Sequence, residues 1–461
     1  MKNIIDIVIL AAGKGSRMKS NLPKVLQPLA AKPLLAHVLE TAQSLENAKT
    51  HIVIGHGAEL VKEEFKSANI SSWILQNEQL GTGHAVDIAL PELEKDSVSL
   101  VLYGDVPLIK TETLNELLDK VTDESMGLLT VSLEDSNGYG RIIRDDSNNI
   151  TAIIEQKDAN KEQLLIKEVN TGILAIKTEQ LRRYLPKLSN NNAQGEYYLT
   201  DIIAMSVEHG VLVNALCIED EMQVQGVNDK KQLATLERNY QRQLAEDLMT
   251  LGATLIDPNR IDIRGNMAVG QDVAIDVNCI FQGEVRLGDN VRIGANCIVG
   301  EIGKSVLIGN NVDIKANTII EDAIIGDNCV IGPYARLRPA THLANNAKIG
   351  NFVETKKSTI GEGSKVNHLT YIGDAIIGKE VNIGAGTITC NYDGLNKFQT
   401  IIEDNAFIGS NSSLVAPVTI GRMATIGAGS TIAIDVPEDN LAVTRAKQRN
   451  ISTWSRPTKK K

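Results

Sequence analysis

The chain is short of aromatic residues, of positive charge and of long apolar runs, and each shortage excludes a class of protein. Its 461 residues include only 5 Phe, 9 Tyr and 2 Trp, too few for the aromatic platforms on which single-stranded nucleic acids stack. Acidic residues outnumber basic ones, 57 to 47, whereas general nucleic-acid binders carry a basic excess. No apolar run approaches the roughly 18 residues of a membrane span. We therefore expect neither a nucleic-acid partner nor a membrane.

Cysteine is also scarce. The five cysteines form no Cys-x-x-Cys pair, so the sequence encodes neither a disulfide framework nor a zinc ribbon. The apolar run after Lys2 looks at first like a signal peptide, but Asp6 interrupts it and a glycine-rich loop follows. We interpret this run as a first β-strand and expect a cytoplasmic protein.

In the first half, apolar strands alternate with helical stretches. Strands are expected at Ile4–Leu10, Ile52–Gly55 and Ser99–Tyr103, and helices at Leu34–Leu45 and Thr113–Val121. Continuous apolar strands interleaved with helices predict an α/β domain with a mainly parallel, buried sheet.

Between Asp229 and Leu251 the pattern changes to that of one amphipathic helix. Apolar residues there recur at spacings of three and four, at Leu233, Leu236, Tyr240, Leu244 and Leu248. We expect this helix to connect two domains.

In the second half an aliphatic or aromatic residue recurs every six positions. The series is Ile263, Val269, Ile275, Phe281, Leu287, Ile293 and Val299; it resumes after a slip at Ile302 and continues to Ile432. Such hexads predict a parallel β-helix whose coils stack these residues inward. At three hexads per coil there would be roughly nine or ten coils. The longest break, between Ile383 and Ile408, contains Asn391-Tyr392-Asp393-Gly394 and is expected to leave the coil, where sites tend to lie.

Three cysteines follow the same register. Cys279, Cys297 and Cys329 each stand two residues before an inward residue of the series, namely Phe281, Val299 and Ile331. We expect them to be small buried hydrophobes, with metal binding by Cys279 and Cys297 as the alternative.

A loop of small residues follows the first strand. Residues 7–18 read Ile-Val-Ile-Leu-Ala-Ala-Gly-Lys-Gly-Ser-Arg-Met, and Pro23-Lys24 comes soon after. Small residues let backbone N–H groups approach a nucleotide, and Arg17 and Lys24 could neutralise its phosphates. The segment is neither a P-loop nor a dinucleotide fingerprint, and by itself it could be an ordinary strand-to-helix turn.

This segment resembles the signature of sugar-nucleotide pyrophosphorylases, with Ser16 in place of the usual motif Thr. Further motifs follow in the family's order: Gln76, Gly81-Thr82, Tyr103-Gly104-Asp105, Gly138-Tyr139-Gly140-Arg141, Glu155-Gln156-Lys157, Asn170-Thr171-Gly172 and Gly226-Val227-Asn228. With the hexads behind them, residues 5–445 resemble the bacterial bifunctional N-acetylglucosamine-1-phosphate uridylyltransferases/glucosamine-1-phosphate N-acetyltransferases. Such enzymes make UDP-N-acetylglucosamine, the precursor of peptidoglycan and lipopolysaccharide.

The resemblance implies an α/β fold class and a domain order. A Rossmann-like nucleotidyltransferase domain would span residues 1–228 and a linker helix residues 229–250. A left-handed parallel β-helix of hexapeptide repeats would span 251–436, followed by a tail at 437–461 that we expect to be solvated past Arg449.

The resemblance also implies a site for UTP and UDP-N-acetylglucosamine in the first domain. Its residues would be Leu10, Ala11, Ala12 and Gly13 around uridine; Lys24 on the nucleotide; Gln76, Gly81 and Thr82 on uracil; Gly104 beside the metal ligand; and Tyr103, Gly140, Glu155 and Asn170 on sugar and ribose. Asp105 and Asn228 would bind Mg²⁺. Asp105 also ends an expected strand, the customary place for ligands in open α/β sheets, although a turn acid before Pro107 is the alternative.

This chemistry needs no protein nucleophile. An oxygen of the sugar phosphate would attack the α-phosphorus of UTP in line, and Mg²⁺ with Arg17 and Lys24 would stabilise the departing pyrophosphate. We expect Arg17 to be the charge-stabilising catalytic residue.

A β-helix alone does not name a reaction, so the residues of the second half must decide. Only His342 and His368 lie beyond residue 250, too few for a three-histidine zinc site. The resemblance makes His368 a general base, with Arg338, Lys356, Tyr371 and Asn382 on glucosamine 1-phosphate. It places acetyl-CoA, the cosubstrate, on Ala385, Asn391, Tyr392, Ser410, Ala428 and Arg445. Without it, His368 could be a packed surface residue.

Two other functions compete with the bifunctional enzyme. One is a single-activity nucleotidyltransferase whose β-helix only regulates or oligomerises; the other is a trimeric scaffold with an inactive first domain. His368 and the loop at Asn391 favour the bifunctional reading. We expect a homotrimer acting on UTP, glucosamine 1-phosphate, N-acetylglucosamine 1-phosphate and acetyl-CoA.

Overall fold

The apolar runs of the first half form one sheet. In the computed structural model, which describes residues 4–459, its strand order is β11-β7-β10-β6-β1-β4-β5. All neighbours on this path are parallel except β10, which runs antiparallel to β6 and β7, so the predicted mainly parallel sheet is confirmed. The strands are β1 (Ile5–Ala11), β4 (Ala48–Ile54), β5 (Ser72–Leu75), β6 (Val98–Tyr103), β7 (Ser125–Ser132), β10 (Glu168–Lys177) and β11 (Leu212–Ile218), with a hairpin of β8 (Arg141–Arg144) and β9 (Ile150–Ile154) beside β10 and a short ribbon of β2 (Pro28–Leu29) and β3 (Lys32–Pro33).

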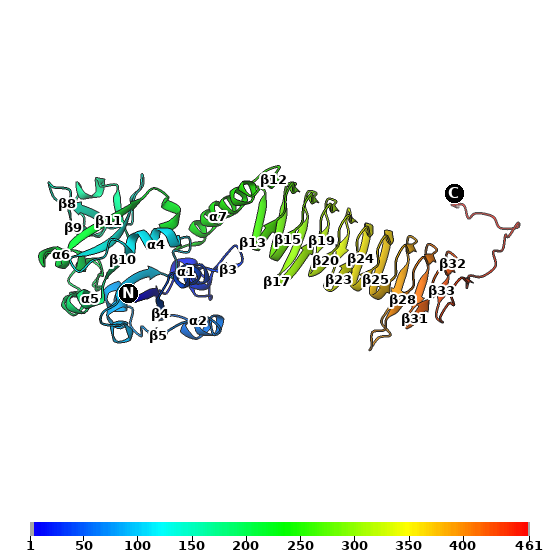
Figure 1. Ribbon diagram of the computed structural model, residues 1–461, viewed down its shortest axis with the longest axis horizontal. Coiled ribbons are helices and arrows are strands. Elements are labelled where there is room, and N and C mark those ends of the chain that lie inside the picture. Colours follow the sequence, from blue (N-terminus) through cyan, green and yellow to red (C-terminus); the bar gives the residue numbers. More distant parts are fainter. Residues whose placement is uncertain (1–3, 460–461) are drawn as a thin grey trace. The chain divides into compact units, whose positions relative to one another are not determined.

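Helices cover both faces of this sheet (Figure 1). Successive residues of β1 point to opposite faces: Ile7 and Ile9 lie in one core with residues of α1 and α4, whereas Val8 and Leu10 lie in the other with residues of α3, α5 and α6. The helices are α1 (Leu34–Gln43), α2 (Ala58–Glu64), α3 (Thr82–Asp87), α4 (Thr111–Leu118), α5 (Thr178–Tyr184) and α6 (Asp201–Glu208).

Parallel pairing brings the carboxyl ends of β1 and β6 together. Leu10 is paired with Tyr103 and, on its other side, with Val53. The glycine-rich loop after β1 therefore leaves the sheet beside Gly104 and Asp105, which follow β6.

One long helix, α7 (Lys230–Thr250), occupies the segment where the three- and four-residue spacing predicts a helix. The chain divides into two units within it, between Tyr240 and Gln241. In the first unit Leu236 packs with Met18, Leu29 and Leu34.

The hexads of the second unit form a single stack of parallel strands (Figure 1). Ile263 pairs with Phe281 and Phe281 with Val299, so a coil comprises three hexads, as the repeat predicts, consistent with the left-handed parallel β-helix that the resemblance implies. The strands are β12 (Thr254–Leu255), β13 (Ile261–Val269), β14 (Ala274–Ile275), β15 (Cys279–Leu287), β16 (Arg292–Ile293), β17 (Ile298–Ile308), β18 (Asp313–Ile314), β19 (Ile319–Ile320), β20 (Ala323–Ile325), β21 (Val330–Ile331), β22 (Arg336–Leu337), β23 (Thr341–Leu343), β24 (Lys348–Ile360), β25 (Lys365–Ile377), β26 (Asn382–Ile383), β27 (Ile388–Cys390), β28 (Thr400–Ile402), β29 (Phe407–Ile408), β30 (Ser413–Val415), β31 (Val418–Ile420), β32 (Thr425–Ile426), β33 (Thr431–Ile432) and β34 (Leu441–Ala442).

The interior of the β-helix contains the predicted aliphatic residues with one error. Ile302 is 61% exposed, because Glu301–Lys304 bulge out of β17 and the inward series resumes at Val306. The three cysteines of the register are buried as predicted. Burial raises the pKa of the Cys279 and Cys329 thiols to about 11, which keeps them protonated and apolar at neutral pH.

Asparagine shapes many corners of the coils. Asn278, Asn290, Asn296, Asn311 and Asn317 all adopt positive φ between 55° and 61°, a left-handed conformation that asparagine tolerates better than other residues with side chains. The corners thus turn at low energetic cost without requiring glycine at each one.

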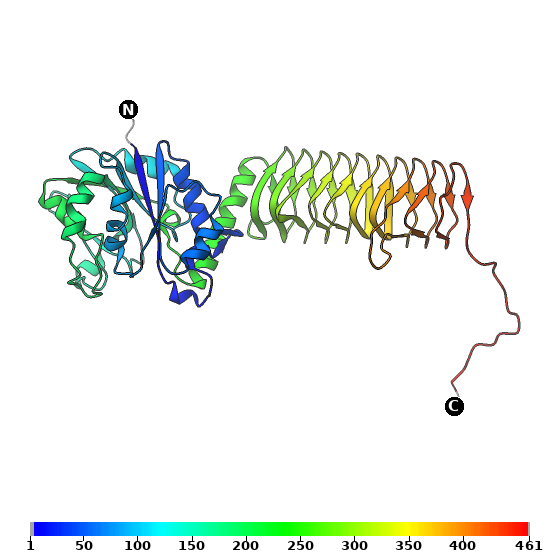
Figure 2. The ribbon, with the colours of Figure 1, turned by 90° about the horizontal axis from the view of Figure 1, so that it is seen from below.

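The predicted excursion is a loop that projects from the coil between β27 and β28 (Figure 2). The β-helix continues past the predicted border at residue 436, because β34 pairs with β32 and Val436 is buried. From residue 443 to 459 the chain has no helix or strand. No helix within residues 4–459 is long and apolar enough to cross a membrane.

The stacked interior predicts a sharp contrast between two adjacent isoleucines. Ile325 is 2% exposed and Ile324 is 48% exposed. Replacing Ile325 with Ala should lower the free energy of unfolding by about 2–5 kcal/mol because it leaves a cavity between coils. Ile324→Ala is the matched control and should cost much less. Urea denaturation followed by circular dichroism measures both, and equal effects would contradict the assigned inward face.

Candidate active sites

A cavity of about 370 Å³ lies at the carboxyl ends of β1 and β6. Most residues predicted to bind the nucleotide line it: Leu10, Ala11, Ala12, Gly13, Lys24, Gln76, Gly81, Thr82, Tyr103, Asp105 and Asn228. Val25, Gln79, Ala85 and Glu196 line it as well and were not predicted. Arg17, Gly104, Gly140, Glu155 and Asn170 lie outside its lining.

Cations and oxygen ligands meet on one side of this cavity. Lys24 Nζ forms an ion pair with Asp105 Oδ2 and donates to Asn228 Oδ1 at 3.3 Å. Arg17 Nη2 donates to the same Asn228 oxygen at 3.0 Å. The Val227 N–H donates to the Asp105 carbonyl at 3.0 Å, which holds the segment before α7 against the end of β6. Residues far apart in sequence thereby form one polar cluster, and Arg17 joins it although it does not line the cavity.

The two predicted metal ligands are suitably placed. Asp105 Oδ2 and Asn228 Oδ1 both contact the Lys24 ammonium, so both oxygens are within reach of one cation. Within residues 4–459 no three His, Cys, Asp or Glu side chains gather as a metal cage. One carboxylate and one amide suit Mg²⁺, which commonly takes its other ligands from phosphates and water.

Gly140, Glu155 and Asn170 form a second group beside Tyr103. The Asn170 N–H donates to the Gly140 carbonyl at 2.8 Å, and Thr200 Oγ1 donates to Glu155 Oε1 at 3.1 Å. Burial raises the pKa of the Glu155 carboxyl. Burial, with the nearby Glu155 and Asp105 carboxylates, also raises the pKa of the Tyr103 phenol, so this hydroxyl remains a hydrogen-bond donor.

Two glycines shape these pockets. Gly172 has φ +84°, and a Cβ there would lie 2.5 Å from the Tyr103 ring. Gly81 has φ +114°, and a Cβ there would lie 2.5 Å from the Tyr197 carbonyl oxygen. Both conformations and both close approaches require the absence of a side chain.

The unpredicted lining residues differ in how they could have been found. Gln79 lies within the Gln76–Thr82 segment that the resemblance singled out. Glu196 reaches the cavity through a tertiary contact, in which Gly83 N–H donates to the Tyr197 carbonyl at 2.8 Å and Tyr197 N–H to that of Leu80 at 2.8 Å. No local pattern signals that pairing.

In the β-helix, in-register stacking aligns the predicted acetyl-transfer residues in a column. Ile349, Val366, Ile383, Ile408 and Ile426 are paired from coil to coil. Two residues after each of them stand, in order, Asn351, His368, Ala385, Ser410 and Ala428. Arg445 Nη1 donates to the Ala428 carbonyl, which extends the column to the end of the β-helix.

The hydrogen bond of His368 assigns its free nitrogen. His368 Nδ1 lies 2.7 Å from Asn351 Oδ1. With the amide oxygen as acceptor, Nδ1 carries the proton and Nε2 keeps a lone pair. The imidazole is thus oriented and able to accept a proton at Nε2.

Arg338, Lys356 and Lys397 form a cationic cluster on the face of the coil that follows His368. Arg338 Nη1 donates to Glu354 Oε1 at 2.8 Å, and Glu354 is paired with Tyr371. The positive charges of Lys397 and Arg338 lower the pKa of Lys356. Lys397 was not predicted; it belongs to the projecting loop, where it is bridged to Tyr392.

The remaining predicted residues lie near these two groups. Asn391 Nδ2 donates to Asp374 Oδ2 at 2.6 Å and anchors the projecting loop, while the Tyr392 hydroxyl donates to the Gly394 carbonyl at 2.6 Å. Asn382 is paired with Lys365 and Phe407 and lies on β26, three residues before Ala385 of the column.

Within one chain His368 and Lys356 lie on different faces of the coil. Lys356 is paired with Gly373, five residues after His368 on β25. The chain turns at Leu369, which has a φ of 48°, so His368 lies before this corner of the coil and Lys356 at the far end of the next face, with Tyr371 between them.

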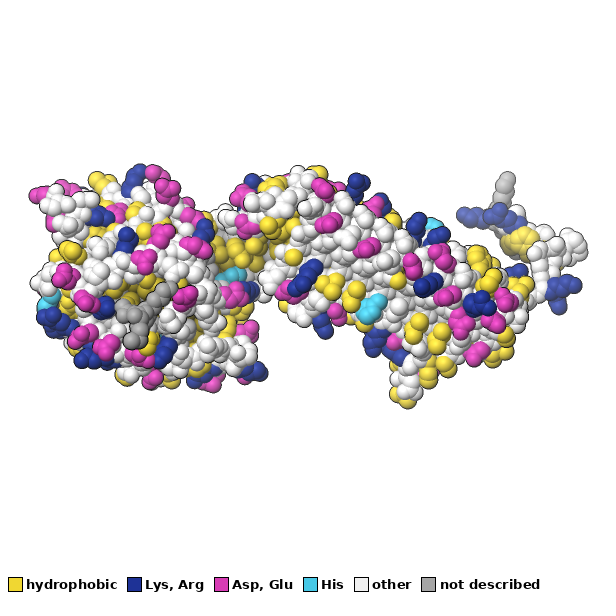
Figure 3. All heavy atoms as spheres, in the orientation of Figure 1, with side chains coloured by type: hydrophobic (Ala, Val, Ile, Leu, Met, Phe, Trp, Pro, Cys, Tyr) yellow, Lys and Arg dark blue, Asp and Glu magenta, His cyan; other side chains and the backbone are white. Residues whose placement is uncertain are grey.

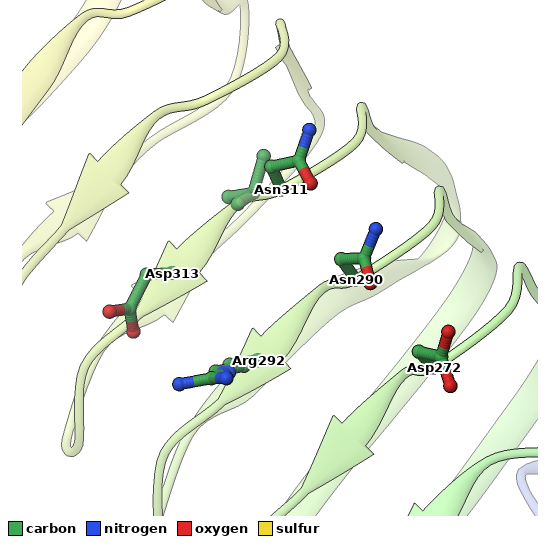
Figure 4. A pocket seen from close by; sticks show the side chains of 6 residues that line it. Asp272, Asn290, Arg292, Asn311 and Asp313 are labelled. Carbon is green, nitrogen blue, oxygen red and sulfur yellow. The ribbon is translucent and has the colours of Figure 1, made fainter.

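Another groove of the β-helix contains none of the predicted residues. Its lining is Asp272, Asn290, Arg292, Asn311, Val312 and Asp313 (Figure 4). Asp272, Asn290 and Asn311 are left-handed corner residues, so this groove follows from the repeat of the coil.

The fold and these residues define a class: a nucleotidyltransferase domain followed by a hexapeptide-repeat domain. Residues 7–165 match the MobA-like NTP transferase domain. Residues 263–345 match the GMPPB C-terminal domain and residues 399–433 the hexapeptide repeat of succinyl-transferase.

Full-length relatives identify the family. The chain is 58% identical over 457 residues to the bifunctional protein GlmU of Saccharophagus degradans, covering 99% of this chain and 100% of the relative. It is 57% identical to that of Marinobacter nauticus and 59% to that of Alcanivorax borkumensis, each over 455 residues and 99% of both chains. The chain belongs to the family of bifunctional GlmU proteins.

Proposed function

We propose that the chain performs its two transfer reactions at two separate sites, one in each unit. The chain is a bifunctional transferase of UDP-N-acetylglucosamine synthesis: it acetylates glucosamine 1-phosphate and transfers UMP from UTP to N-acetylglucosamine 1-phosphate. The observation that carries the assignment is the presence in one chain of the Lys24–Asp105–Asn228 cluster and the His368 column.

The first site is the cavity at the ends of β1 and β6. The small residues Leu10–Gly13 let the backbone approach UTP, and Gln76, Gly81 and Thr82 contact uracil. Gly140, Glu155 and Asn170 hold the sugar beside Tyr103. The phosphate oxygen of the sugar attacks the α-phosphorus, and Arg17 and Lys24 stabilise the charge that develops on the leaving pyrophosphate.

Asp105 and Asn228 are the residues that would hold Mg²⁺. When bound, the ion neutralises phosphate charge and orients the phosphates for in-line displacement. Gly104, between Tyr103 and Asp105, packs closely under this site, since a Cβ there would lie 3.2 Å from the Val25 side chain and 3.3 Å from that of Ala11.

The second site uses the His368 column. His368 Nε2 accepts a proton from the amine of glucosamine 1-phosphate as that amine attacks the thioester carbonyl, and the C–S bond then breaks to release CoA. An imidazole with one ring nitrogen free to accept a proton suits this role. Arg338 and Lys356 bind the phosphate, and Tyr371 and Asn382 orient the sugar. Acetyl-CoA lies along the small residues Ala385, Ser410 and Ala428, with Asn391, Tyr392 and Arg445 at its sides.

A homotrimer would complete this second site. The separation of His368 from Lys356 within one chain favours a site shared between copies. Tyr334, Phe352 and Leu369, on successive coils, are 53%, 54% and 63% exposed and have positive φ, an unusual conformation for large side chains. The Tyr334 and Phe352 rings stack at 5.4 Å. Figure 3 shows further apolar side chains over the projecting loop and adjoining coils. Such exposed surface suits a contact with another copy.

The Asp105→Asn variant should lose uridylyl transfer and retain acetyl transfer, because it removes the only carboxylate of the proposed metal pair. Release of pyrophosphate and of CoA is assayed on the same purified protein. Asp119→Asn, at an exposed acid after α4, is the matched control and should retain both activities. Equal loss of both activities in Asp105→Asn would refute independent sites.

The His368→Ala variant should acetylate about 10²–10⁴-fold more slowly, the usual contribution of a general base, while uridylyl transfer persists. His342→Ala, at the other histidine of the β-helix, serves as the control and should acetylate normally. An acetylation rate of His368→Ala within a few-fold of the unmodified chain would remove His368 from the mechanism.

Shared acetyl-transfer sites predict complementation between inactive chains. His368→Ala and Arg445→Ala chains, refolded together, should recover part of the acetylation, because some interfaces of mixed trimers combine both original residues. Each parent must first be shown inactive and mixed trimers demonstrated by mass. No recovery under these conditions would place the whole site within one chain.

A further inference from the structure

Gln76 in the first cavity has an amide whose orientation can be read from its partners. Its side chain is 4% exposed, and Nε2 donates to the Gly81 carbonyl at 3.3 Å. A carbonyl oxygen only accepts hydrogen bonds, so the amide nitrogen must face Gly81.

The second N–H of this amide is occupied by a histidine that no reaction step above uses. Gln76 Nε2 lies 3.1 Å from His84 Nδ1. His84 belongs to α3, which begins at Thr82 on the wall of the same cavity. Since Gln76 is the donor, His84 Nδ1 is the acceptor and the imidazole is neutral with its proton on Nε2.

Both donors of Gln76 are therefore used inside the protein. Within residues 4–459 no hydrogen bond to Gln76 Oε1 is found, and Gln76 lines the cavity. The amide offers a ligand one polar atom, and that atom is an acceptor.

An acceptor at this point distinguishes two pyrimidines by their Watson–Crick edge. Uracil carries an N–H donor at N3, which pairs with Gln76 Oε1. Cytosine carries a lone pair at N3, which would face the Gln76 oxygen without a proton between them, and an unsatisfied buried pair of acceptors is costly.

We propose that His84 is a positioning residue for nucleotide selection, which holds the Gln76 amide with its oxygen toward the base and so favours UTP over CTP. This rests on the proposed contact of Gln76 with uracil. His84 does not line the cavity, so it acts on the base only through Gln76. Two hydrogen bonds orient the Gln76 amide, and the one to His84, at 3.1 Å, is shorter than the one to the Gly81 carbonyl, at 3.3 Å.

The test compares kcat/KM for UTP with that for CTP in uridylyl transfer to N-acetylglucosamine 1-phosphate. His84→Leu removes the acceptor at Nδ1 and should lower the UTP:CTP ratio about tenfold. His84→Asn places an amide oxygen where Nδ1 lies and should restore the ratio, whereas His84→Gln, whose oxygen reaches further, should not. A merely structural role would lower both rates together and leave the ratio unchanged.

Two further measurements separate the possible failures. Thermal unfolding of each variant reports whether the first unit is folded. If His84→Leu fails to fold, the UTP:CTP ratios of the His84→Asn and His84→Gln variants decide. Gln76→Leu should also lose the UTP preference. If Gln76→Leu changes the ratio and the His84 variants leave it within twofold, the inference is wrong and the base contact stands. If Gln76→Leu leaves the ratio unchanged, or if the unmodified chain uses CTP as well as UTP, then both the proposed contact of Gln76 with uracil and the role of His84 are wrong.

Discussion

Parallel backbone pairing in strict register is the constraint on which both sites depend. In the first unit it brings the ends of β1 and β6 side by side, so the loop after Ala11 and the acid at Asp105 face one cavity. In the second unit it repeats each position once per coil, so residues far apart in sequence, from Asn351 to Ala428, form one column. A one-residue slip would turn every aliphatic side chain of a strand outward and would also break this column.

The cations of the two sites have different surroundings. In the first, Lys24 and Arg17 are paired with Asp105 and Asn228, so the cations are held in place before an anion arrives. In the second, Lys356 faces the like charges of Lys397 and Arg338, which lower its pKa. A phosphate bound among them, as we propose, would relieve that repulsion, so the cluster would favour an anionic acceptor over a neutral sugar.

Much of the fold could be predicted from the sequence because its patterns are local. The six-residue period predicted the inward positions of the β-helix, and three- and four-residue spacing predicted a helix where α7 lies. Ile302 was assigned wrongly because an insertion preserves composition while shifting phase, and period alone cannot tell a bulge from a new coil. The predicted border at residue 436 was too early, because Leu441 still pairs with Thr425 although no hexad remains in the sequence there.

Site residues were predictable where motif order marked them and not where tertiary contact creates them. Leu10–Gly13, Lys24 and Asp105 came from one strand–loop segment and a strand end. Glu196, Lys397 and the bond between His84 and Gln76 depend on how separate segments meet, and no local spacing reports that. The left-handed conformations of Tyr334, Phe352 and Leu369 could likewise not be predicted from the sequence, since these residue types ordinarily avoid such corners.

One polypeptide acetylates and then uridylylates the same sugar phosphate. The most direct measurement supplies the purified chain with glucosamine 1-phosphate, acetyl-CoA, UTP and Mg²⁺, and quantifies CoA, pyrophosphate and UDP-N-acetylglucosamine together. We expect all three to form, UDP-N-acetylglucosamine to appear only after CoA, and the omission of acetyl-CoA to abolish UDP-N-acetylglucosamine formation. Pyrophosphate release with UTP and N-acetylglucosamine 1-phosphate, without any CoA release with acetyl-CoA and glucosamine 1-phosphate, would contradict the bifunctional assignment. The chain would then be a single-activity nucleotidyltransferase.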